Sequence, residues 1–405
     1  MRKYKALLLL AVVSVASVAR ADDGLGLKRG GNASEVSISG VSSGAAMAVQ
    51  YAVGHSASIS GVGSIAGPPW GCANGSVSQS INTCMCGRQD PDNKIDVAWG
   101  LAASGKIDAL SASSTPLRLK RSYVFQSPAD VTVVEKSGKT SLAFLSSFIG
   151  HDPQADWGNA ADGSNKAGHG IIAPDRHNDS CQASDSDTTY IRHCGAEDNA
   201  GKLFHALYDD GDAPFDPSAR VDEIPETEVW WFEQQPLIDL VKPSTAVAPD
   251  DCWWEWLCFW TFKNERRKNF DMAEKGRIYI PPSCRQPGSS CRVHIALHGC
   301  KQARDDFATK AGYNNWAEHY KVIVVYPAIE HSALWVDEKC QAGPFNKAFD
   351  QLPFKPNPND CWDWWGYLDT LEQPDRYLTT TSPQMRVIER IIAEVTAPLA
   401  PPRVK

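Results

Sequence analysis

Five residues near the start of the chain constrain its fold more than any other feature. Gly40-Val41-Ser42-Ser43-Gly44 follows an alternating apolar and polar segment, 36–39, and precedes the small, apolar residues of 45–53. This pattern predicts a strand, a tight turn and a helix. It fits the G-x-S-x-G nucleophile elbow, in which two glycines avoid clashes with the neighbouring strand and helix. We therefore predict Ser42 as a nucleophile, with a purely structural turn as the alternative.

The remaining segments predict strands that alternate with helices. Strands are expected at 59–66, 122–125, 277–280, 293–297 and 322–326, and helices at 107–110, 203–208, 303–319 and 383–395. This alternation is typical of an α/β fold, in which a mostly parallel sheet carries helices on both faces. Residues 147–184 are rich in Gly, Asp, Asn and His. We expect them to form a long loop, and long loops inside compact domains are often functional.

Local composition indicates the domain organisation. Residues 1–21 combine a basic start, an apolar stretch and a small-x-small cleavage site, which is typical of a secretory signal peptide rather than a retained membrane anchor. Residues 22–405 are then expected to form a single catalytic domain. At about 209–270, acidic and Pro-rich pieces surround two tryptophan clusters. We predict a Trp-rich insertion here that serves as an adsorbing patch or a lid, with simple packing as the alternative.

Charge and cysteine content exclude several kinds of partner. The formal net charge of −8 gives no reason to expect nucleic acid or anionic lipid. All 12 cysteines lie beyond residue 21, an even number in a chain bound for an oxidising compartment, so we expect disulfides. Cys84-x-Cys86 lacks a second pair, and Cys252 and Cys258 have no histidine nearby. Neither pattern predicts zinc, and we expect no metal and no organic cofactor.

A nucleophilic serine needs a base, and the base needs a carboxylate that orients it. Asp130 follows the strand expected at 122–125, and the acid comes between the serine and the histidine along the chain in this type of enzyme. His169 lies between two glycines in the long loop, a poor position for a core residue. We predict Asp130 as the acid and His169 as the base. The alternatives in the loop are Asp152, Asp156, Asp162 and Asp175 for the acid, and His151 and His177 for the base.

A second motif, Ile295-Ala296-Leu297-His298-Gly299-Cys300, ends an expected strand. A strand that ends in His-Gly typically supplies one amide of an oxyanion hole, and the residue after the nucleophile, here Ser43, supplies the other. His298 itself is not expected to be the base. The His-Gly strand normally precedes the nucleophile, but here it follows by about 250 residues. Either His298 is unrelated to catalysis, or the fold is circularly permuted, which nearby termini permit.

The motifs in this order resemble a known family. Ser-Gly-Val-Ser-Ser-Gly at 39–44, Ala-Leu-His-Gly-Cys at 296–300 and Asn-Asp-Cys-Trp-Asp-Trp at 359–364 are similar to the extracellular poly(3-hydroxybutyrate) depolymerases. The chain looks most like the circularly permuted, single-domain type, over roughly 34–208 and 272–395. The resemblance implies a circularly permuted α/β-hydrolase fold. It also implies that Ser42 is the nucleophile, Asp130 the acid and His169 the base, with the Ser43 and Cys300 amides as the oxyanion hole.

The same resemblance implies disulfides and substrate contacts. The implied disulfides are Cys181–Cys194, Cys284–Cys291 and Cys300–Cys361, with Cys72 joined to Cys84 or Cys86; one of the latter two could instead join Cys340. In such enzymes a tryptophan of the Cys-Trp-Asp-Trp segment lines the polymer groove. We therefore expect Trp362, Trp364 and His298 to contact substrate, because an apolar aromatic wall suits a methyl-bearing polyester. Packing in the core is the alternative for either tryptophan.

Taken together, these features predict a secreted, monomeric serine esterase, either extracellular or periplasmic. It would hydrolyse poly(3-hydroxybutyrate) or related polyhydroxyalkanoates to soluble monomers and oligomers through an acyl-enzyme. Its expected partners are the polyester surface or oligomers, with neither nucleic acid nor membrane. One alternative is an acetyl or feruloyl esterase that acts on plant polysaccharide with the same triad. Another is a catalytically inactive protein that binds polymer or glycan through its tryptophans.

Overall fold

The computed structural model describes most of the chain after residue 25. The described residues are 26–110, 118–148, 153–183, 187, 189–209, 213–242, 269–286, 288–302, 304–329, 339–340, 357–369 and 373–398. The predicted signal peptide lies outside them. So do Asp152, His151, Cys252, Cys258 and the tryptophans at 253–260.

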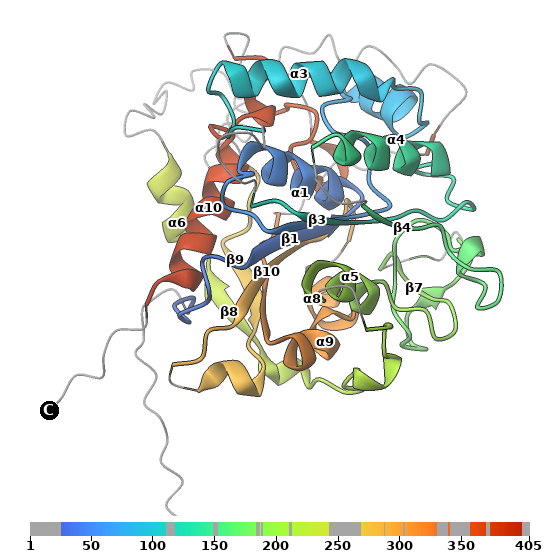
Figure 1. Cartoon of the computed structure of the whole chain (residues 1–405), viewed down its shortest axis with the longest axis vertical. Helices are drawn as coiled ribbons and strands as arrows, with labels where there is room; N and C mark the ends of the chain where they lie inside the picture. Colours follow the sequence, from blue (N-terminus) through green and yellow to red (C-terminus); the bar gives the residue numbers. More distant parts are fainter. Residues whose placement is uncertain are drawn as a thin grey trace, which may run out of the picture.

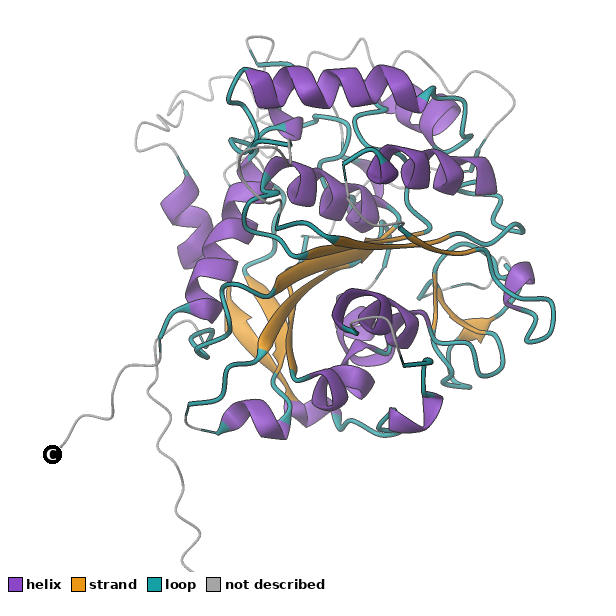
Figure 2. Cartoon of the chain, viewed as in Figure 1, coloured by secondary structure: helices purple, strands orange, loops and turns teal. Residues whose placement is uncertain are grey.

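Within this part of the chain, an eight-stranded sheet organises the fold (Figures 1 and 2). Its order is β4-β3-β2-β1-β10-β11-β9-β8. The strands are β1 (Val36–Val41), β2 (Gly61–Ile65), β3 (Arg121–Phe125), β4 (Gln154–Asp156), β8 (Val229–Glu233), β9 (Lys275–Tyr279), β10 (Arg292–Leu297) and β11 (Val322–Tyr326). β9 pairs antiparallel with both β11 and β8, and the other pairs are parallel. The mostly parallel sheet that the sequence predicts is confirmed.

Helices cover both faces of this sheet (Figure 1). One face carries α1 (Ser43–Gly54), α3 (Pro91–Ala103), α4 (Glu135–Ser146), α6 (Gln235–Val241) and α10 (Pro383–Thr396). The other carries α5 (Asn199–Tyr208), α8 (Arg304–Lys310) and α9 (Tyr313–Tyr320). Strand side chains alternate between the two hydrophobic clusters, so that Ile38 packs toward α1 and α10 whereas Val41 packs toward α5 and α9. Burial on both faces explains why the central strands are almost wholly apolar or small.

The strand order accounts for the unusual order of the motifs. β1, which leads to Ser42, lies beside β10, which leads to His298, although the two are far apart in sequence. Their parallel register pairs Gly40 with Leu297, so that both motifs emerge at the same end of the sheet. The strands that normally precede the nucleophile here follow it, and they still occupy adjacent positions in the sheet.

Two of the predicted helices were wrong. Residues 107–110 are not helical; the helix in this region is α3, which begins with Asp90 as its N-cap and Pro91 in its first turn and is followed by Gly105 at φ +68°. Proline and a capping aspartate are common at that end of a helix. The helix expected at 303–319 is two helices, α8 and α9. Gly312, at φ +92°, separates them, because a left-handed residue cannot continue a right-handed helix.

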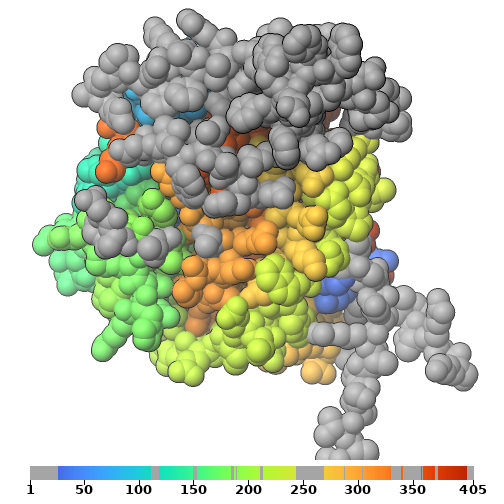
Figure 3. Space-filling model, turned by 180° about the vertical axis from the view of Figure 1, so that it is seen from behind, coloured from blue at the N-terminus to red at the C-terminus, as the bar shows by residue number. Residues whose placement is uncertain are grey.

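The long loop predicted at 147–184 contains secondary structure. Its short strands β5 (Ile171–Ile172) and β6 (Asp179–Ser180) flank β7 (Ile191–His193) in a small sheet of order β5-β7-β6. In Figure 3 the green surface of this region lies beside the orange surface around α8. A hydrogen bond from Gln302 Nε2 to the Thr189 carbonyl joins the two regions at 2.8 Å.

The region predicted as an insertion, 209–270, contributes to the main sheet. β8 is the edge strand, and α6 packs on α10. Phe232 is buried, Trp230 is half-buried and Trp231 is 44% exposed. The first tryptophan cluster is therefore a strand, and the second lies outside the described residues. Within the described part of the chain, every helix is too short or too polar to span a bilayer.

Five disulfides link the described cysteines. Cys181–Cys194, Cys284–Cys291 and Cys300–Cys361 match the expected pairs. The pairing that the sequence left open is Cys72–Cys84 together with Cys86–Cys340. Cys252 and Cys258 lie outside the described residues.

Candidate active site

Ser42 occupies a strained turn between β1 and α1. Its backbone has φ 55° and ψ −117°, a conformation that non-glycine residues rarely adopt. The Ser42 N–H donates to the Ile65 carbonyl of β2 at 2.9 Å, which fixes the turn to the sheet. The side chain is almost buried, with the residue 9% exposed. Such a turn presents the hydroxyl at the end of the sheet rather than inside a helix or a strand.

The two glycines of the motif permit this turn, as the sequence predicts. A Cβ at Gly40 would lie 2.3 Å from the backbone of Gly44 in α1. A Cβ at Gly44 would lie 2.4 Å from the carbonyl oxygens of both Leu297 and His298. Both distances are far below van der Waals contact, and the opposing atoms are backbone that cannot move aside. The helix that follows the nucleophile can therefore approach β10 only because both positions lack side chains.

Asp130 lies in the turn after β3, where it is held by main-chain and side-chain donors. Its Oδ1 accepts from the amides of Thr132 and Val133 at 2.8 and 3.0 Å. Its Oδ2 accepts from Gln126 Nε2 at 2.9 Å. These bonds hold the carboxylate plane in one orientation and satisfy its buried oxygens.

His169 completes this arrangement. Its Nδ1 lies 2.8 Å from Asp130 Oδ2, and both residues are buried. A carboxylate on Nδ1 selects the tautomer whose Nε2 can accept a proton, which is the geometry of a general base oriented by an acid. The structure thus brings together Asp130 and His169, as the sequence predicts, and they come from opposite ends of a segment of about 40 residues.

The described alternatives to these residues are engaged elsewhere. Asp156 pairs with Lys202 Nζ at 2.9 Å, and His177 is paired with Asp175 at 2.9 Å on the surface. Asp162 caps the start of the short helical turn at Ser164. None of these groups contacts the Asp130–His169 pair in the hydrogen bonds of the described residues.

The predicted oxyanion-hole residues lie on either side of Ser42. Ser43 is the first residue of α1, where backbone N–H groups have no partner within the helix. Cys300 lies in the turn after β10 and lines the same pocket as Ser42. A Cβ at Gly299 would lie 3.3 Å from Ser42 Cβ, so the turn after β10 passes close to Ser42.

His298 and Trp362 support this turn. The buried His298 ring bonds the Gly299 carbonyl through Nδ1 at 2.8 Å and accepts from the Ile329 amide through Nε2 at 3.1 Å. Burial lowers the pKa of His298 to about 4, so the ring is neutral at pH 7. Trp362 is fully buried, and its Nε1 donates to the His298 carbonyl at 3.0 Å. This geometry favours a supporting role for both residues over contact with substrate.

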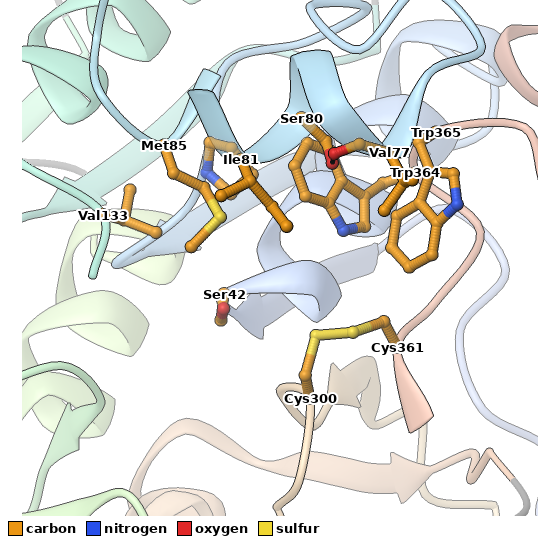
Figure 4. A pocket seen from close by; sticks show the side chains of 11 residues that line it. Ser42, Val77, Ser80, Ile81, Met85, Val133, Cys300, Cys361, Trp364 and Trp365 are labelled. Atoms are coloured by element: carbon orange, nitrogen blue, oxygen red, sulfur yellow. Dashed lines mark hydrogen bonds between the residues drawn. A yellow bond between two sulfur atoms is a disulfide. The ribbon is translucent and has the colours of Figure 1, made fainter. Parts of the chain in front are cut away.

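An apolar pocket opens above Ser42 (Figure 4). The side chains around it are those of Pro68, Val77, Ser80, Ile81, Met85, Val133, Trp364 and Trp365, with the Cys300–Cys361 disulfide below. Trp364 is the predicted substrate-binding residue that reaches this pocket. The sequence analysis missed the wall formed by Val77, Ile81 and Met85. Their spacing of four residues, which places them on one face of a helix, is a signal that could have found it.

Comparisons with known proteins place the whole chain beside depolymerases of one polyester. No family model matches the chain. It is 25% identical over 373 residues to the poly(3-hydroxybutyrate) depolymerase of Delftia acidovorans, covering 90% of this chain and 60% of the relative. It is 27% identical over 351 residues to the polyhydroxybutyrate depolymerase of Talaromyces funiculosus, covering 83% of each. The chain thus spans less than two thirds of the Delftia relative.

Two solved structures share the fold. A PHB depolymerase from Penicillium funiculosum superposes with a TM-score of 0.65, and a PHB depolymerase complexed with an R3HB trimer superposes with 0.66. Each is 22% identical and is covered to 98%, against 91% of this chain. The chain is similar to the poly(3-hydroxybutyrate) depolymerases. The predicted resemblance and the α/β fold are therefore confirmed, and the circular permutation fits the solved structures.

Proposed function

We propose that the chain is a secreted serine esterase that hydrolyses poly(3-hydroxybutyrate) or related polyhydroxyalkanoates. The observation that carries the proposal is the buried 2.8 Å contact between His169 Nδ1 and Asp130 Oδ2, in a fold that presents Ser42 on a nucleophile elbow. The relationship to PHB depolymerases supports the choice of substrate.

The reaction would proceed in two steps. His169 Nε2 takes the proton of Ser42 Oγ as the oxygen attacks an ester carbonyl of the polymer. Asp130 stabilises the imidazolium, and the Ser43 and Cys300 amides bind the oxyanion. The tetrahedral intermediate collapses as the imidazolium protonates the leaving alkoxide, which releases the alcohol end of the chain. Water, deprotonated by the same imidazole, then attacks the acyl-enzyme and releases the acid end.

The pocket above Ser42 suits such a substrate. Its wall is formed by aliphatic, thioether and indole groups, which match the methyl and methylene groups of a hydroxyalkanoate. Trp364 is 5% exposed, and its Nε1 has no hydrogen-bond partner among the described residues. We propose that Trp364 contacts the polymer chain, with its N–H available to an ester oxygen.

Neither alternative gains support. Both relatives named above are depolymerases of polyhydroxybutyrate, which does not favour a polysaccharide esterase. The contact between His169 and Asp130 argues against an inactive binding protein. We further propose that the protein acts as a monomer, and that its partner is the polyester surface or soluble oligomers. Disulfides in the described chain and the leader-like residues 1–21 support secretion, to the extracellular space or the periplasm.

The decisive experiment is the clearing of a poly(3-hydroxybutyrate) suspension by the mature protein, beside Ser42→Ala, with release of soluble 3-hydroxybutyrate as the second readout. Clearing and release by the wild type alone are expected. If the suspension stays turbid while a nitrophenyl ester is cleaved in a Ser42-dependent way, the esterase mechanism holds and the polymer assignment is wrong. If Ser42→Ala retains full esterase activity, the proposed nucleophile is wrong.

A further inference from the structure

The neighbours of His169 in the chain have no side chains that restrict its backbone. Gly168 and Gly170 flank the residue, and Gly170 has φ +139°. A Cβ at Gly170 would lie 2.1 Å from the Tyr190 carbonyl oxygen, so this glycine is required by close packing against the strand region before β7. The contact with Asp130 holds only the ring of His169. A general base must be held within a fraction of an ångström of its productive position, which requires that its backbone is also fixed.

Arg192 of β7 fixes that backbone. Its Nε and Nη2 both donate to the His169 carbonyl oxygen, at 2.9 and 2.8 Å. Nη2 also pairs with Asp187 Oδ2 at 2.7 Å, and Nη1 donates to the Ser180 and Gln182 carbonyls at 3.3 and 3.5 Å. All five guanidinium N–H groups therefore have acceptors. The side chain of Arg192 is 1% exposed and that of Asp187 is 9% exposed, so the pair is buried.

The strands of the small sheet hold Arg192 in place. β7 pairs with β5 and β6, and the Cys181–Cys194 disulfide links β7 to the segment after β6. The amide of Gly168 donates to the Cys181 carbonyl at 2.8 Å. The residue before His169 is thus attached to the same small sheet that presents the guanidinium to the His169 carbonyl.

We propose that Arg192, neutralised by Asp187, is a positioning residue for the general base His169, an inference that rests on the proposed function. Arg192 touches no reacting atom. It acts by holding the His169 main chain, so that the imidazole keeps its position against Asp130. Burying a charged arginine carries a desolvation free energy that an apolar side chain of similar volume would avoid, so packing alone does not explain this residue. Its donors converge on the carbonyl of the catalytic histidine, which is what such a role requires.

The test is a double-mutant cycle measured on a soluble nitrophenyl butyrate, which does not depend on the polymer. The four proteins are the wild type, Arg192→Met, His169→Ala and the double variant. Arg192→Met is expected to lower kcat about 100-fold with KM changed less than about threefold, because a misplaced base slows chemistry rather than binding. In the His169→Ala background, the same substitution is expected to change the residual kcat less than about threefold.

Arg277 of β9 provides a matched control. It is also buried, its guanidinium pairs with Glu226 at 3.3 Å, and it stacks on Trp231 at 4.2 Å. Arg277→Met removes a buried arginine of the main sheet, and we expect kcat per folded molecule to stay within about twofold of the wild type. Folding of each variant is checked by circular dichroism and thermal unfolding.

Several outcomes would overturn the proposal. One is a kcat for folded Arg192→Met close to that of the wild type. Another is the same fold-decrease in kcat with and without His169, or the same decrease in Arg277→Met, since either indicates a general structural effect.

If Arg192→Met does not fold, Arg192→Lys and Asp187→Asn enter the same cycle. Lysine keeps the charge but lacks the planar fork, so we expect a roughly tenfold, non-additive loss; an unchanged kcat in both variants rejects the proposal. Retained activity of Ser42→Ala would instead refute the proposed function.

Discussion

The two halves of the proposed catalytic site are fixed in different ways. On the nucleophile side, Ser42 is held by main chain: β1, α1 and the end of β10 approach so closely that Gly40 and Gly44 admit no Cβ. On the base side, Asp130 and His169 extend from turns and loops, and side-chain hydrogen bonds from Gln126 and Arg192 hold them. The first region uses packing of the sheet, whereas the second uses polar contacts of individual residues.

This difference implies that damage to the two sides should be separable. A substitution at the elbow changes backbone positions and should lower stability and activity together. A substitution in the polar network leaves the sheet intact, so it should lower activity while most of the stability remains.

The largest effect is expected for Asp130→Asn. The amide can still accept from the Thr132 and Val133 amides, so the turn should persist. It no longer holds His169 in the required tautomer, nor stabilises the imidazolium. We expect kcat to fall by about 10⁴-fold, with a change in the free energy of unfolding of only about 1 kcal/mol. Steady-state kinetics on a soluble ester and urea unfolding measure both. An equally large loss of stability would contradict the separation.

Gly44→Ala, unlike Asp130→Asn, should lower stability as well as activity. The added Cβ meets the Leu297 and His298 carbonyl oxygens at 2.4 Å, which forces α1 away from β10. We expect a loss of about 3 kcal/mol in the free energy of unfolding and a loss of activity in the molecules that remain folded. Gly54→Ala is the control, because its Cβ would meet only Met385 Sδ at 3.6 Å in the same helix. A Gly44→Ala protein as stable as this control would refute the packing argument.

Acid should change the free energy of unfolding in opposite directions through groups on the two sides. Burial lowers the pKa of His294 to about 3 and that of His298 to about 4, both on the nucleophile side. Below pH 6.5 the unfolded chain binds protons that these folded histidines do not, so stability falls as pH drops from 6.5 toward 4. Burial instead raises the pKa of Glu197, near the small sheet, to about 7. Its folded form binds the extra proton, so this contribution falls as pH rises from 4.5 to 7.

Urea unfolding between pH 4 and 8 measures the balance. We expect the histidines to dominate, since both are fully buried, and therefore a lower unfolding midpoint at pH 4.5 than at pH 7. His294→Gln should show a shallower decline than the wild type, although it is less stable at pH 7. Glu197→Gln should remove the opposing contribution and steepen the net decline with acid. A midpoint that is independent of pH over this range would contradict the assigned shifts.

The nucleophile side could be predicted well from the sequence. Its strands and helix have regular periodicity, and the glycines at 40 and 44 have a local steric reason that does not depend on distant residues. The order of the His-Gly motif after the serine was enough to suggest the permutation, which the adjacency of β1 and β10 accounts for. By contrast, the helix predicted at 107–110 is wrong, although Asp90-Pro91 is a local signal for the start of α3.

On the base side, the sequence predicted the two residues themselves but not the residues that hold them in place. Asp130 and His169 could be named from chain order and from flanking glycines. Arg192 could not, because its partners lie 23 residues away at His169 and in a small sheet with strands too short to show periodicity. The pocket wall differs from Arg192, because the spacing of Val77, Ile81 and Met85 indicates one face of a helix. Only the fold shows that this face lies opposite the Cys361–Trp365 segment.

The smallest effect should separate two tryptophans of one motif. Trp362 Nε1 donates to the His298 carbonyl and so braces the turn beside Ser42, whereas Trp364 Nε1 has no partner among the described residues. Changing either to Phe removes the same volume, so the difference between them isolates the hydrogen bond. We expect Trp362→Phe to be less stable than Trp364→Phe by about 1 kcal/mol in thermal or urea unfolding.

Trp364→Phe should instead raise KM for hydroxybutyrate oligomers by a few fold. Of the two indole N–H groups, only that of Trp364 is available to substrate in the wild type, and this variant removes it. Equal stabilities with equal KM values would mean that neither indole N–H matters. Ring packing, in the core for Trp362 and in the pocket wall for Trp364, would then be their whole contribution.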